Sequence, residues 1–378
     1  MNMRLAALIL TTATCISVAA AQAPRSPTPA PIDAPIVATR VVGGLVNPWG
    51  LAFLPDGRML VTERPGRLRI VGKDGTLSAP VSGVPAVYSR GQGGLLDVTI
   101  SPRFVSDQLV YLSFAEPGEG GAGTAVARGR LAGNALEHVE VIWRQTPKVE
   151  SNNHWGSRLV FAKDGTLFVT TGDRFRFRER VQDLGSTIGK VIRINADGSI
   201  PADNPFAKRE GARPEIWSYG HRNVQAAALD PASGQLWTLE HGARGGDELN
   251  RPQSGRNYGW PVITYGADYS GVKIGEGTAK AGMEQPLYYW DPVIAPSGAL
   301  FYTGDAYPEW RGSLFVGSLT PGGLVRLTLD GDRVRGEERY LDDVGRVRNV
   351  VQGPDGLLYL LIDASNGSIQ RVSPKPAR

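Results

Sequence analysis

A short unit of sequence recurs six times along the chain and limits the available folds more than any other feature. Each copy is a turn followed by a strand of small, β-branched or aromatic residues, and then a charged turn and a second strand. The clear copies span residues 55–63, 163–171 and 354–362, and the weaker ones span 104–112, 231–239 and 310–317. This recurrence predicts a repeat architecture built from antiparallel strands.

One copy alone buries only one side of a small sheet, so the copies must pack against one another. Radial closure leaves few open strand edges. We therefore predict an all-β fold: a six-bladed β-propeller of four-stranded antiparallel blades, formed by one domain over residues 37–378. A solenoid and two stacked sandwiches are the alternatives, but neither explains evenly recurring units with long loops between them. In a propeller such loops converge at one mouth of the central channel, where ligands bind.

The first residues have the layout of a secretory signal peptide, with Arg4 ahead of an apolar run and small residues after it. We predict a signal peptide over residues 1–23, a Pro/Ala-rich extended leader over 24–36, and a periplasmic or secreted mature protein. The single cysteine, Cys15, lies in this signal, so a lipid-anchored form is the alternative. No later segment is apolar for long enough to predict a membrane span.

The charge of the chain is close to balanced, at a formal +4. Lysine and arginine are scattered except in the strip 174–180, which we interpret as a solvated strand or loop face. Nucleic acid is therefore not expected as a partner.

Only four histidines occur, and His154 stands just before a predicted strand, close to a loop mouth. An imidazole there can accept a proton near neutral pH. Asp173 follows the next strand and provides a carboxylate that could fix the imidazole tautomer. On spacing alone, a hydrogen-bonded structural histidine explains the pattern better than a catalytic one.

Three further segments carry charged or polar groups suited to a ligand. Arg222 and Asn223 follow a glycine and could grip a carboxylate or a quinone oxygen, or form a salt bridge between blades. The segment 240–250 combines glycines with carboxylates and offers oxygen ligands for calcium, without EF-hand spacing. Arg346 and Arg348 share one face if their segment is extended, which suits a multivalent anion or a solvated edge strand.

Motifs of several other enzyme classes do not occur. There is no G-x-S-x-G elbow, no H-E-x-x-H, no phosphate-binding P-loop and no glycine-rich turn between a strand and a helix. Serine hydrolysis, zinc peptidase chemistry and nicotinamide-dependent oxidation are therefore disfavoured.

Taken in order, the motifs resemble those of the soluble PQQ-dependent aldose sugar dehydrogenases, within the broader glucose/sorbosone dehydrogenase family. PQQ is pyrroloquinoline quinone. The resemblance covers nearly the whole mature chain, through residues 47–53, 91–96, 153–158, 172–174, 214–220, 221–223, 240–242, 245–248, 257–261 and 346–348. Several motifs in matching order are far more specific than any one of them.

The resemblance implies a role for each matching residue. His154 is similar to the family's catalytic base, Asp173 to the carboxylate that orients it, and Arg222 to the cation that polarises the quinone together with calcium. The positions at which the family contacts PQQ are Gln92, His154, Arg222, Asn223, Arg346 and Arg348. The carbonyls of Gly242 and Ala243 match ligands of the calcium beside the cofactor, and Glu248 with the carbonyl of Tyr258 matches a second, structural calcium.

The implied reaction is oxidation of an aldose at its anomeric carbon to a lactone, by His154-assisted hydride transfer to PQQ, with electrons passed on to an external acceptor. A monomer or weak dimer is expected. Two positions depart from the family pattern: Ala243 stands where proline is frequent, and Thr320 where some relatives carry a cofactor-contacting lysine. A calcium-dependent lactonase and a non-catalytic ligand-binding propeller are the alternative functions.

Overall fold

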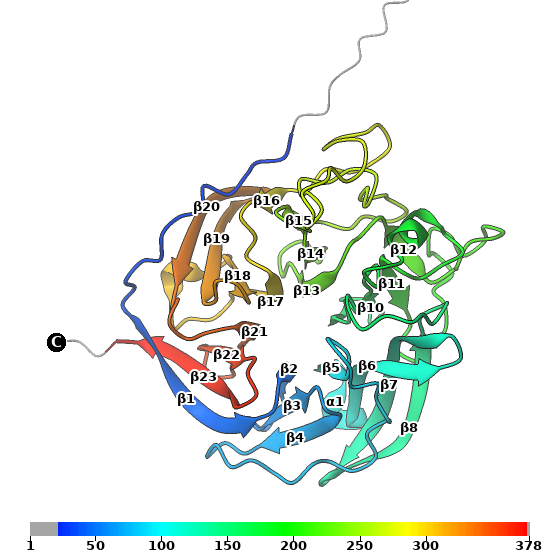
Figure 1. Ribbon diagram of the computed structural model, residues 1–378. Helices are drawn as coiled ribbons and strands as arrows, with labels where there is room; N and C mark the ends of the chain where they lie inside the picture. The colour runs from blue at the N-terminus through cyan, green and yellow to red at the C-terminus, as the bar shows by residue number, and fades with distance from the viewer. Residues whose placement is uncertain (1–21, 376–378) are drawn as a thin grey trace, which may run out of the picture.

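The computed structural model describes residues 22–375 and forms a closed ring of six antiparallel sheets (Figure 1). The predicted six-bladed β-propeller is therefore confirmed. The first strands of successive blades contact one another around the whole ring, so they surround the central channel. No helix in the described part is long and apolar enough to cross a membrane. Cys15 and nearly all of the predicted signal peptide, residues 1–23, lie outside the described residues.

Blades follow one another in chain order, and within each blade neighbouring strands pair antiparallel. The first three blades contain β2 (Pro48–Phe53), β3 (Met59–Glu63) and β4 (Arg67–Val71); β5 (Leu95–Ile100), β6 (Leu109–Gly118), β7 (Gly121–Ala132) and β8 (Ala135–Arg144); and β9 (Leu159–Phe161), β10 (Leu167–Thr170), β11 (Lys190–Ile194) and β12 (Ile216–Tyr219). The last three contain β13 (Val224–Leu229), β14 (Leu236–Glu240), β15 (Asp247–Asn250) and β16 (Tyr288–Trp290); β17 (Pro296–Phe301), β18 (Leu314–Ser318), β19 (Leu324–Asp330) and β20 (Arg333–Tyr340); and β21 (Val347–Gln352), β22 (Leu358–Ile362), β23 (Gly367–Pro374) and β1 (Ile36–Leu45).

The two ends of the chain close the ring together. β1 pairs antiparallel with β23, with Ile36 opposite Pro374 and Leu45 opposite Gly367, so the N-terminal strand completes the C-terminal blade (Figure 1). This pairing replaces two free strand edges with one continuous ladder. Neither end of the propeller can detach without breaking the last blade.

Only the first blade differs from the predicted four strands. Its fourth position is taken by residues 77–81, which bond to β4 through Ser78 N to Ile70 O (2.9 Å) and Val81 N to Leu68 O (2.8 Å) without forming a regular strand. The described helices are the short α1 (Phe104–Asp107), η1 (Arg178–Gln182) and η2 (Pro308–Trp310).

Each of the six sequence repeats coincides with the second strand of a blade and the turn before it. In three turns the same aspartate bond recurs: Asp164 Oδ1 accepts from Thr166 N at 2.9 Å, and Asp56 and Asp355 accept in the same way two residues on. The glycine after each aspartate has positive φ, which glycine adopts without steric cost. The repeat is thus a turn signal followed by a buried strand.

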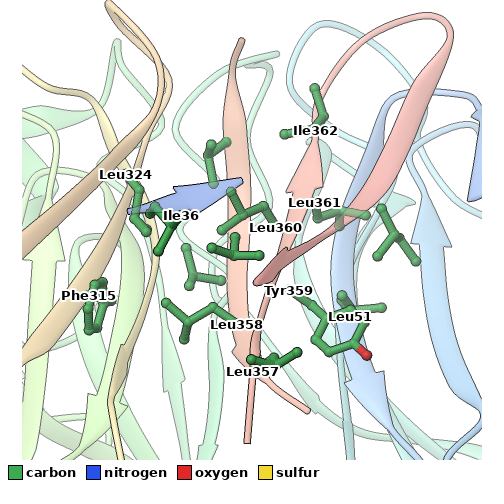
Figure 2. Packing of buried hydrophobic residues seen from close by; sticks show 14 of the residues in the cluster. Ile36, Leu51, Phe315, Leu324, Leu357, Leu358, Tyr359, Leu360, Leu361 and Ile362 are labelled. Carbon is green, nitrogen blue, oxygen red and sulfur yellow. The ribbon is translucent and has the colours of Figure 1, made fainter. Parts of the chain in front are cut away.

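Second strands are buried on both faces because a neighbouring blade covers each side. All five residues of β22 are buried or nearly so, as are those of β3 and β18. Figure 2 shows Leu358 and Leu360 packed between Leu51 of the first blade and Phe315 of the fifth. The core is therefore a series of apolar layers between blades, which explains why these strands are mainly apolar.

Residues 24–36, the predicted leader, run extended along the outside of the fourth and fifth blades (Figure 1). Ser26 N donates to Tyr289 O at 2.8 Å, and Ile32 N donates to Arg339 O at 2.9 Å. The side chain of Ser26 donates to Glu337 at 2.5 Å. This segment thus adds hydrogen bonds to two outer strands.

Candidate active site

The charged residues singled out above gather at one mouth of the ring. In an antiparallel pair, the start of the first strand and the end of the second lie at the same edge. His154 and Arg222 precede the first strands β9 and β13, while Asp173 and Glu240 lie at or just beyond the ends of the second strands β10 and β14. Blade topology therefore places side chains distant in sequence on one rim.

His154 is buried and is held by both its backbone and its ring. Its N–H donates to Gln92 Oε1 at 2.9 Å, and Gln92 N in turn donates to Asn152 O at 2.9 Å. Its Nδ1 lies 2.6 Å from Asp173 Oδ1. The backbone has a φ of +54°, an uncommon conformation for a residue with a side chain. Gln92, predicted as a cofactor contact, thus clamps the backbone of His154.

Asp173 is buried and accepts hydrogen bonds on both carboxylate oxygens. Oδ1 accepts from Phe175 N at 2.8 Å as well as facing His154, and Oδ2 accepts from Trp260 Nε1 at 2.9 Å. Gly172 allows this approach, because a Cβ there would lie 2.2 Å from His154 O. The carboxylate is therefore fixed by three donors from separate parts of the chain.

The electrostatics of this pair favour an ionised aspartate and a neutral imidazole. Burial raises the pKa of Asp173, but the contact with His154, the charge of Arg222 and the hydrogen bond from Phe175 N together hold the pKa below its ordinary value. Burial also lowers the pKa of His154, which Asp173 only partly opposes. An aspartate that accepts at Nδ1 leaves the lone pair on Nε2, so His154 is suited to take up a proton.

Arg222 lies between Asp173 and the loop after β14. Asp173 N donates to Arg222 O at 2.6 Å, and Arg222 Nη1 donates to His241 O at 3.0 Å and to Gly242 O. The guanidinium carbon lies 5.2 Å from the ring centre of Trp260. Nε of Arg222 is buried without a hydrogen-bond partner among the described residues. Within residues 22–375 Arg222 forms no salt bridge, so the structure does not support a salt bridge between blades as its use.

Asn223 joins two blades and keeps one donor unused. Its Oδ1 accepts from Gly156 N at 3.1 Å, and its backbone bridges Gly172. Its Nδ2 is buried and has no hydrogen-bond partner in the part of the chain described. Unpaired buried donors are costly, so Nδ2 of Asn223 and Nε of Arg222 are well suited to a ligand rich in acceptors.

The two predicted arginines on the last blade lie differently. Arg348 is buried, pairs with Asp363 at 2.6 Å and donates to Gln225 Oε1 at 2.6 Å. Arg346 is exposed and donates to Leu319 O at 3.1 Å, beside Thr320. Arg348 is therefore part of the channel wall, whereas Arg346 extends over the rim.

His241 shows how closely the site residues are grouped. Burial lowers its pKa to about 3, and the positive charges of Arg348, His154 and Arg222 add to this effect. Its Nε2 donates to Pro296 O at 2.8 Å. The charges of Arg222 and Arg348, from the fourth and sixth blades, thus help to keep this imidazole neutral.

The predicted calcium ligands lie before, within and after β15: Gly242 and Ala243 precede it, Glu248 belongs to it and Tyr258 follows it. Gly242 N donates to Asp247 Oδ1 at 2.7 Å, while Gly242 O accepts from Arg222. A Cβ at residue 242 would lie 2.2 Å from Gly245 O, so this turn requires glycine. The buried Ala243 follows, with only a methyl group in place of the family's proline. Both predicted carbonyl ligands therefore sit in a tightly folded loop.

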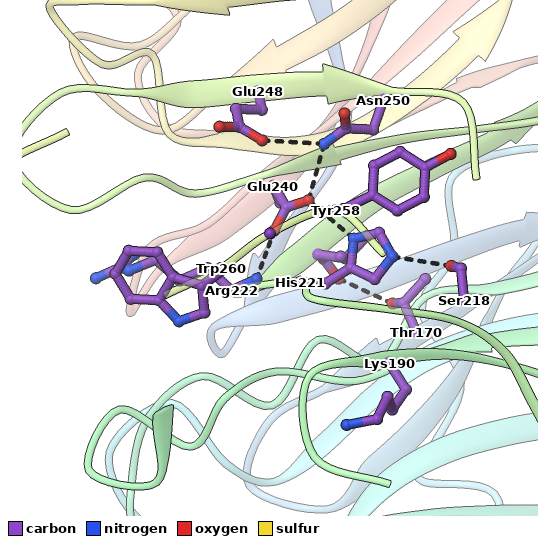
Figure 3. Close-up of polar contacts among 12 residues, drawn as sticks. Thr170, Lys190, Ser218, His221, Arg222, Glu240, Glu248, Asn250, Tyr258 and Trp260 are labelled. Atoms are coloured by element: carbon purple, nitrogen blue, oxygen red, sulfur yellow. Dashed lines mark hydrogen bonds and ion pairs between the residues drawn. The ribbon is translucent and has the colours of Figure 1, made fainter. Parts of the chain in front are cut away.

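Figure 3 shows two carboxylates near the second predicted calcium site. Asn250 Nδ2 donates to Glu240 Oε1 at 2.9 Å and to Glu248 Oε2 at 3.2 Å. Burial raises the pKa of Glu248 well above its ordinary value, and the like charge of Glu240 raises it further. Both residues line a cavity of about 10 Å³ together with Tyr258, whose ring stacks on His221 at 4.8 Å. This space is near the lower limit of what holds one water-sized species.

A larger cavity of about 510 Å³ opens beside the His154–Asp173 pair, and Asp173 and Arg222 line it. Two exposed aromatic residues, Phe175 and Tyr269, also line it. The Phe175 ring meets His154 edge-on at 5.2 Å. This cavity is large enough for a small polar substrate.

Sequence reasoning assigned no role to Trp260 or Glu240, which organise this site. Trp260 fixes Asp173, and Glu240 accepts from Arg222 N at 2.5 Å and faces His221 Nδ1 at 3.0 Å. Both residues lie in the motifs that carried the family resemblance, so that resemblance was the signal that could have identified them. The interpretation of 174–180 as solvated is wrong for Arg174, which is fully buried and lies 3.2 Å from the ring centre of Trp155.

The fold and the site define a class of protein: a six-bladed propeller with a histidine–carboxylate pair and a cationic cluster, formed by Arg222, Arg346 and Arg348, at one mouth. The model of the glucose/sorbosone dehydrogenase family matches residues 45–371. The chain belongs to this family.

Relatives with similar sequences and structures carry dehydrogenase names. Aldose sugar dehydrogenase YliI of Escherichia coli is 48% identical over 338 residues, 88% of this chain and 91% of the relative. A crystal structure of a glucose dehydrogenase matches with a TM-score of 0.87 and 51% identity over 89% of this chain and 99% of its own. The PQQ-bound aldose sugar dehydrogenase of Streptomyces coelicolor matches with a TM-score of 0.75 and 28% identity, over 89% and 97% respectively.

Proposed function

We propose that this protein oxidises aldose sugars at the anomeric carbon to lactones, with PQQ and calcium as cofactors and an external electron acceptor. The observation that carries the proposal is the buried His154–Asp173 pair, 2.6 Å apart, beside a cationic cluster with unpaired donors. The printed names of the relatives support the same reaction class.

The residues at the mouth fit an anionic, acceptor-rich cofactor such as PQQ. Asn223 Nδ2 and Arg222 Nε are buried donors without partners among the described residues. Arg346 and Arg348 add positive charge, which suits the carboxylates of PQQ, and Gln92 completes the predicted contacts. When bound, PQQ would supply a two-electron acceptor that the amino acids cannot provide.

Calcium would be held mainly by oxygen atoms of the loop after β14. The carbonyls of Gly242 and Ala243 are the proposed ligands beside the cofactor, and Glu248 with the carbonyl of Tyr258 are those of a second ion. A divalent cation near Glu248 would offset the repulsion from Glu240, which already raises the pKa of Glu248. Arg222 donates to Gly242 O and so connects the first group to the catalytic pair.

The chain's own part in the reaction is proton transfer and positioning. Nε2 of His154 would take the proton from the anomeric hydroxyl, and Asp173 would stabilise the imidazolium that forms. Arg222 would stabilise negative charge that develops on the acceptor. Phe175 and Tyr269 offer aromatic faces against which a sugar ring can pack, and the Phe175 ring also contacts His154 edge-on.

The test is to titrate the cofactor-free protein with PQQ plus calcium and to follow dye reduction with a panel of aldoses. His154→Asn should lose about 100-fold or more in kcat while its affinity for PQQ changes little. His138→Asn is a matched control, because His138 is exposed and its φ of +50° resembles the +54° of His154. Undiminished turnover in His154→Asn would refute the role of His154.

The same preparation tests the alternatives. Hydrolysis of lactones by the cofactor-free protein would favour a calcium-dependent lactonase. Lack of dye reduction after PQQ and calcium have bound would favour a non-catalytic ligand-binding propeller. No structural observation favours either function over sugar oxidation.

A further inference from the structure

Arg64, to which the sequence analysis gave no role, lies at the same mouth as the cationic cluster. It directly follows β3, the second strand of the first blade, and such strands end at this rim. Its backbone N–H donates to Asn47 O at 3.1 Å, and Asn47 Nδ2 donates to Asp363 Oδ1 at 3.4 Å. Asp363 is the partner of Arg348, so one hydrogen-bonded chain connects Arg64 to Arg348.

Around the ion pair of Arg348 and Asp363, positive charges outnumber negative ones. Arg64 and Arg346 lie near the ion pair of Arg348 and Asp363, and within the described part of the chain Asp363 forms an ion pair only with Arg348. Burial lowers the pKa of Arg348, and the positive charges of Arg64 and Arg346 lower it further. The neighbouring Glu63 does not compensate, because it already pairs with Arg67 and Arg69 at 2.7 and 3.3 Å. Two guanidinium charges are therefore left for an anion.

The guanidinium of Arg64 is held in place but not saturated. Its Nη1 donates to Gly91 O at 2.8 Å, directly before Gln92. Its Nε is buried and has no hydrogen-bond partner among residues 22–375. A positioned arginine with unused donors is typical of a carboxylate-binding site.

We propose that Arg64 binds a carboxylate of the anionic cofactor and supplies the positive charge that some relatives carry as lysine at the position of Thr320. The proposal rests on the proposed function and extends it. Thr320 is exposed and follows Leu319, whose carbonyl accepts from Arg346. The cluster therefore has a neutral residue on the Thr320 side and an additional cation on the Arg64 side.

The test measures the affinity of the cofactor-free protein for PQQ by calorimetry, at constant calcium and at two salt concentrations. Arg64→Gln should weaken binding about tenfold or more, with a reduced salt dependence, because a charge-assisted hydrogen bond is lost. Arg64→Met, which keeps the aliphatic stem, should behave alike. Arg58→Gln is the matched control, since Arg58 is exposed at the opposite end of the same blade and pairs with Asp56.

A second variant separates cofactor binding from support of the loop at Gly91. Thr320→Lys in the Arg64→Gln background should regain most of the lost affinity if the missing element is positive charge. A lysine at 320 cannot restore the bond to Gly91 O, so failure of this rescue would overturn the proposal. Affinities of Arg64→Gln and Arg64→Met within twofold of the wild type would overturn it as well. A wild-type protein that does not bind PQQ would instead refute the proposed function itself.

Discussion

Trp260 donates its indole hydrogen to Asp173 Oδ2 over 2.9 Å, across 87 residues of sequence. Because His154 and Phe175 N occupy the other oxygen, both oxygens of this carboxylate face donors. Both oxygen positions must therefore be acceptors. An aspartate provides two acceptor oxygens, whereas an asparagine provides only one. The base and its orienting group are thus set by contacts from several blades.

Asp173→Asn should therefore reduce kcat about 100-fold or more. The NH2 group of the asparagine would face either Trp260 Nε1, which is itself a donor, or Nδ1 of His154, which would then have to be the unprotonated ring nitrogen. The affinity for PQQ should change little. Trp260→Phe removes only one of the donors and should cost about tenfold or less. Steady-state kinetics at saturating PQQ and sugar, with calorimetry of PQQ binding, would measure both effects. A wild-type kcat in Asp173→Asn would show that this carboxylate does not orient the base.

The pH dependence of turnover should follow the lowered pKa of His154. The base acts only when it is neutral, so activity should persist below pH 6.5 and fall only as the pH drops through the lowered pKa. Asp173 raises this pKa, so Asp173→Asn should shift the His154 titration to still lower pH. Profiles of kcat/KM and an NMR titration of the imidazole would measure this. A titration of His154 above pH 6.5 would contradict it.

The lowered pKa of His154 also predicts how the free energy of unfolding depends on pH. Between the unfolded-state pKa near 6.5 and the lower folded-state pKa, the unfolded chain binds a proton that folded His154 does not. The free energy of unfolding should therefore decrease as the pH falls below 6.5. His154→Asn should reduce this slope, by at most about 1.4 kcal/mol per pH unit. Urea denaturation from pH 7 to 5 would measure it, and an unchanged slope would count against a depressed pKa.

Calcium should raise the melting temperature of the cofactor-free protein, and Glu248→Gln should lose a large part of that gain. A saturating ion at one hundred times its Kd stabilises the folded state by about 2.7 kcal/mol. Glu276→Gln is a suitable control, because Glu276 is exposed and pairs only with Lys280 at 2.8 Å. Calcium-dependent melting curves would decide the matter. Equal shifts in wild type and Glu248→Gln would exclude Glu248 as a ligand.

Leu360→Ala should destabilise the propeller by about 2–5 kcal/mol, because Leu360 is fully buried between blades and leaves a cavity that cannot collapse (Figure 2). Val105→Ala should have almost no effect, since Val105 is 79% exposed. Urea denaturation would measure both. A loss below 1 kcal/mol in Leu360→Ala would show that the blades repack around the gap.

Much of the fold could be predicted because its signals are local. An aspartate followed by a glycine forms its turn through contacts two residues apart, and a strand covered on both faces is mainly apolar. The pair of His154 and Asp173 could be anticipated for a related reason, as both flank neighbouring strands of one blade. The irregular edge at residues 77–81 could not, because its few bonds to β4 are supplemented by Asn134 of the next blade, which is distant in sequence.

What the sequence determined by itself is the repeat, and with it the class of fold and the identity of the groups available at the loop ends. What only the tertiary structure decided is which of these groups meet. Trp260 reaches Asp173, Gln225 reaches Arg348 and β1 reaches β23 only after the ring has closed. The physical reason is that contacts between blades depend on distances set by the whole closed ring, whereas turns and strands depend on neighbours along the chain.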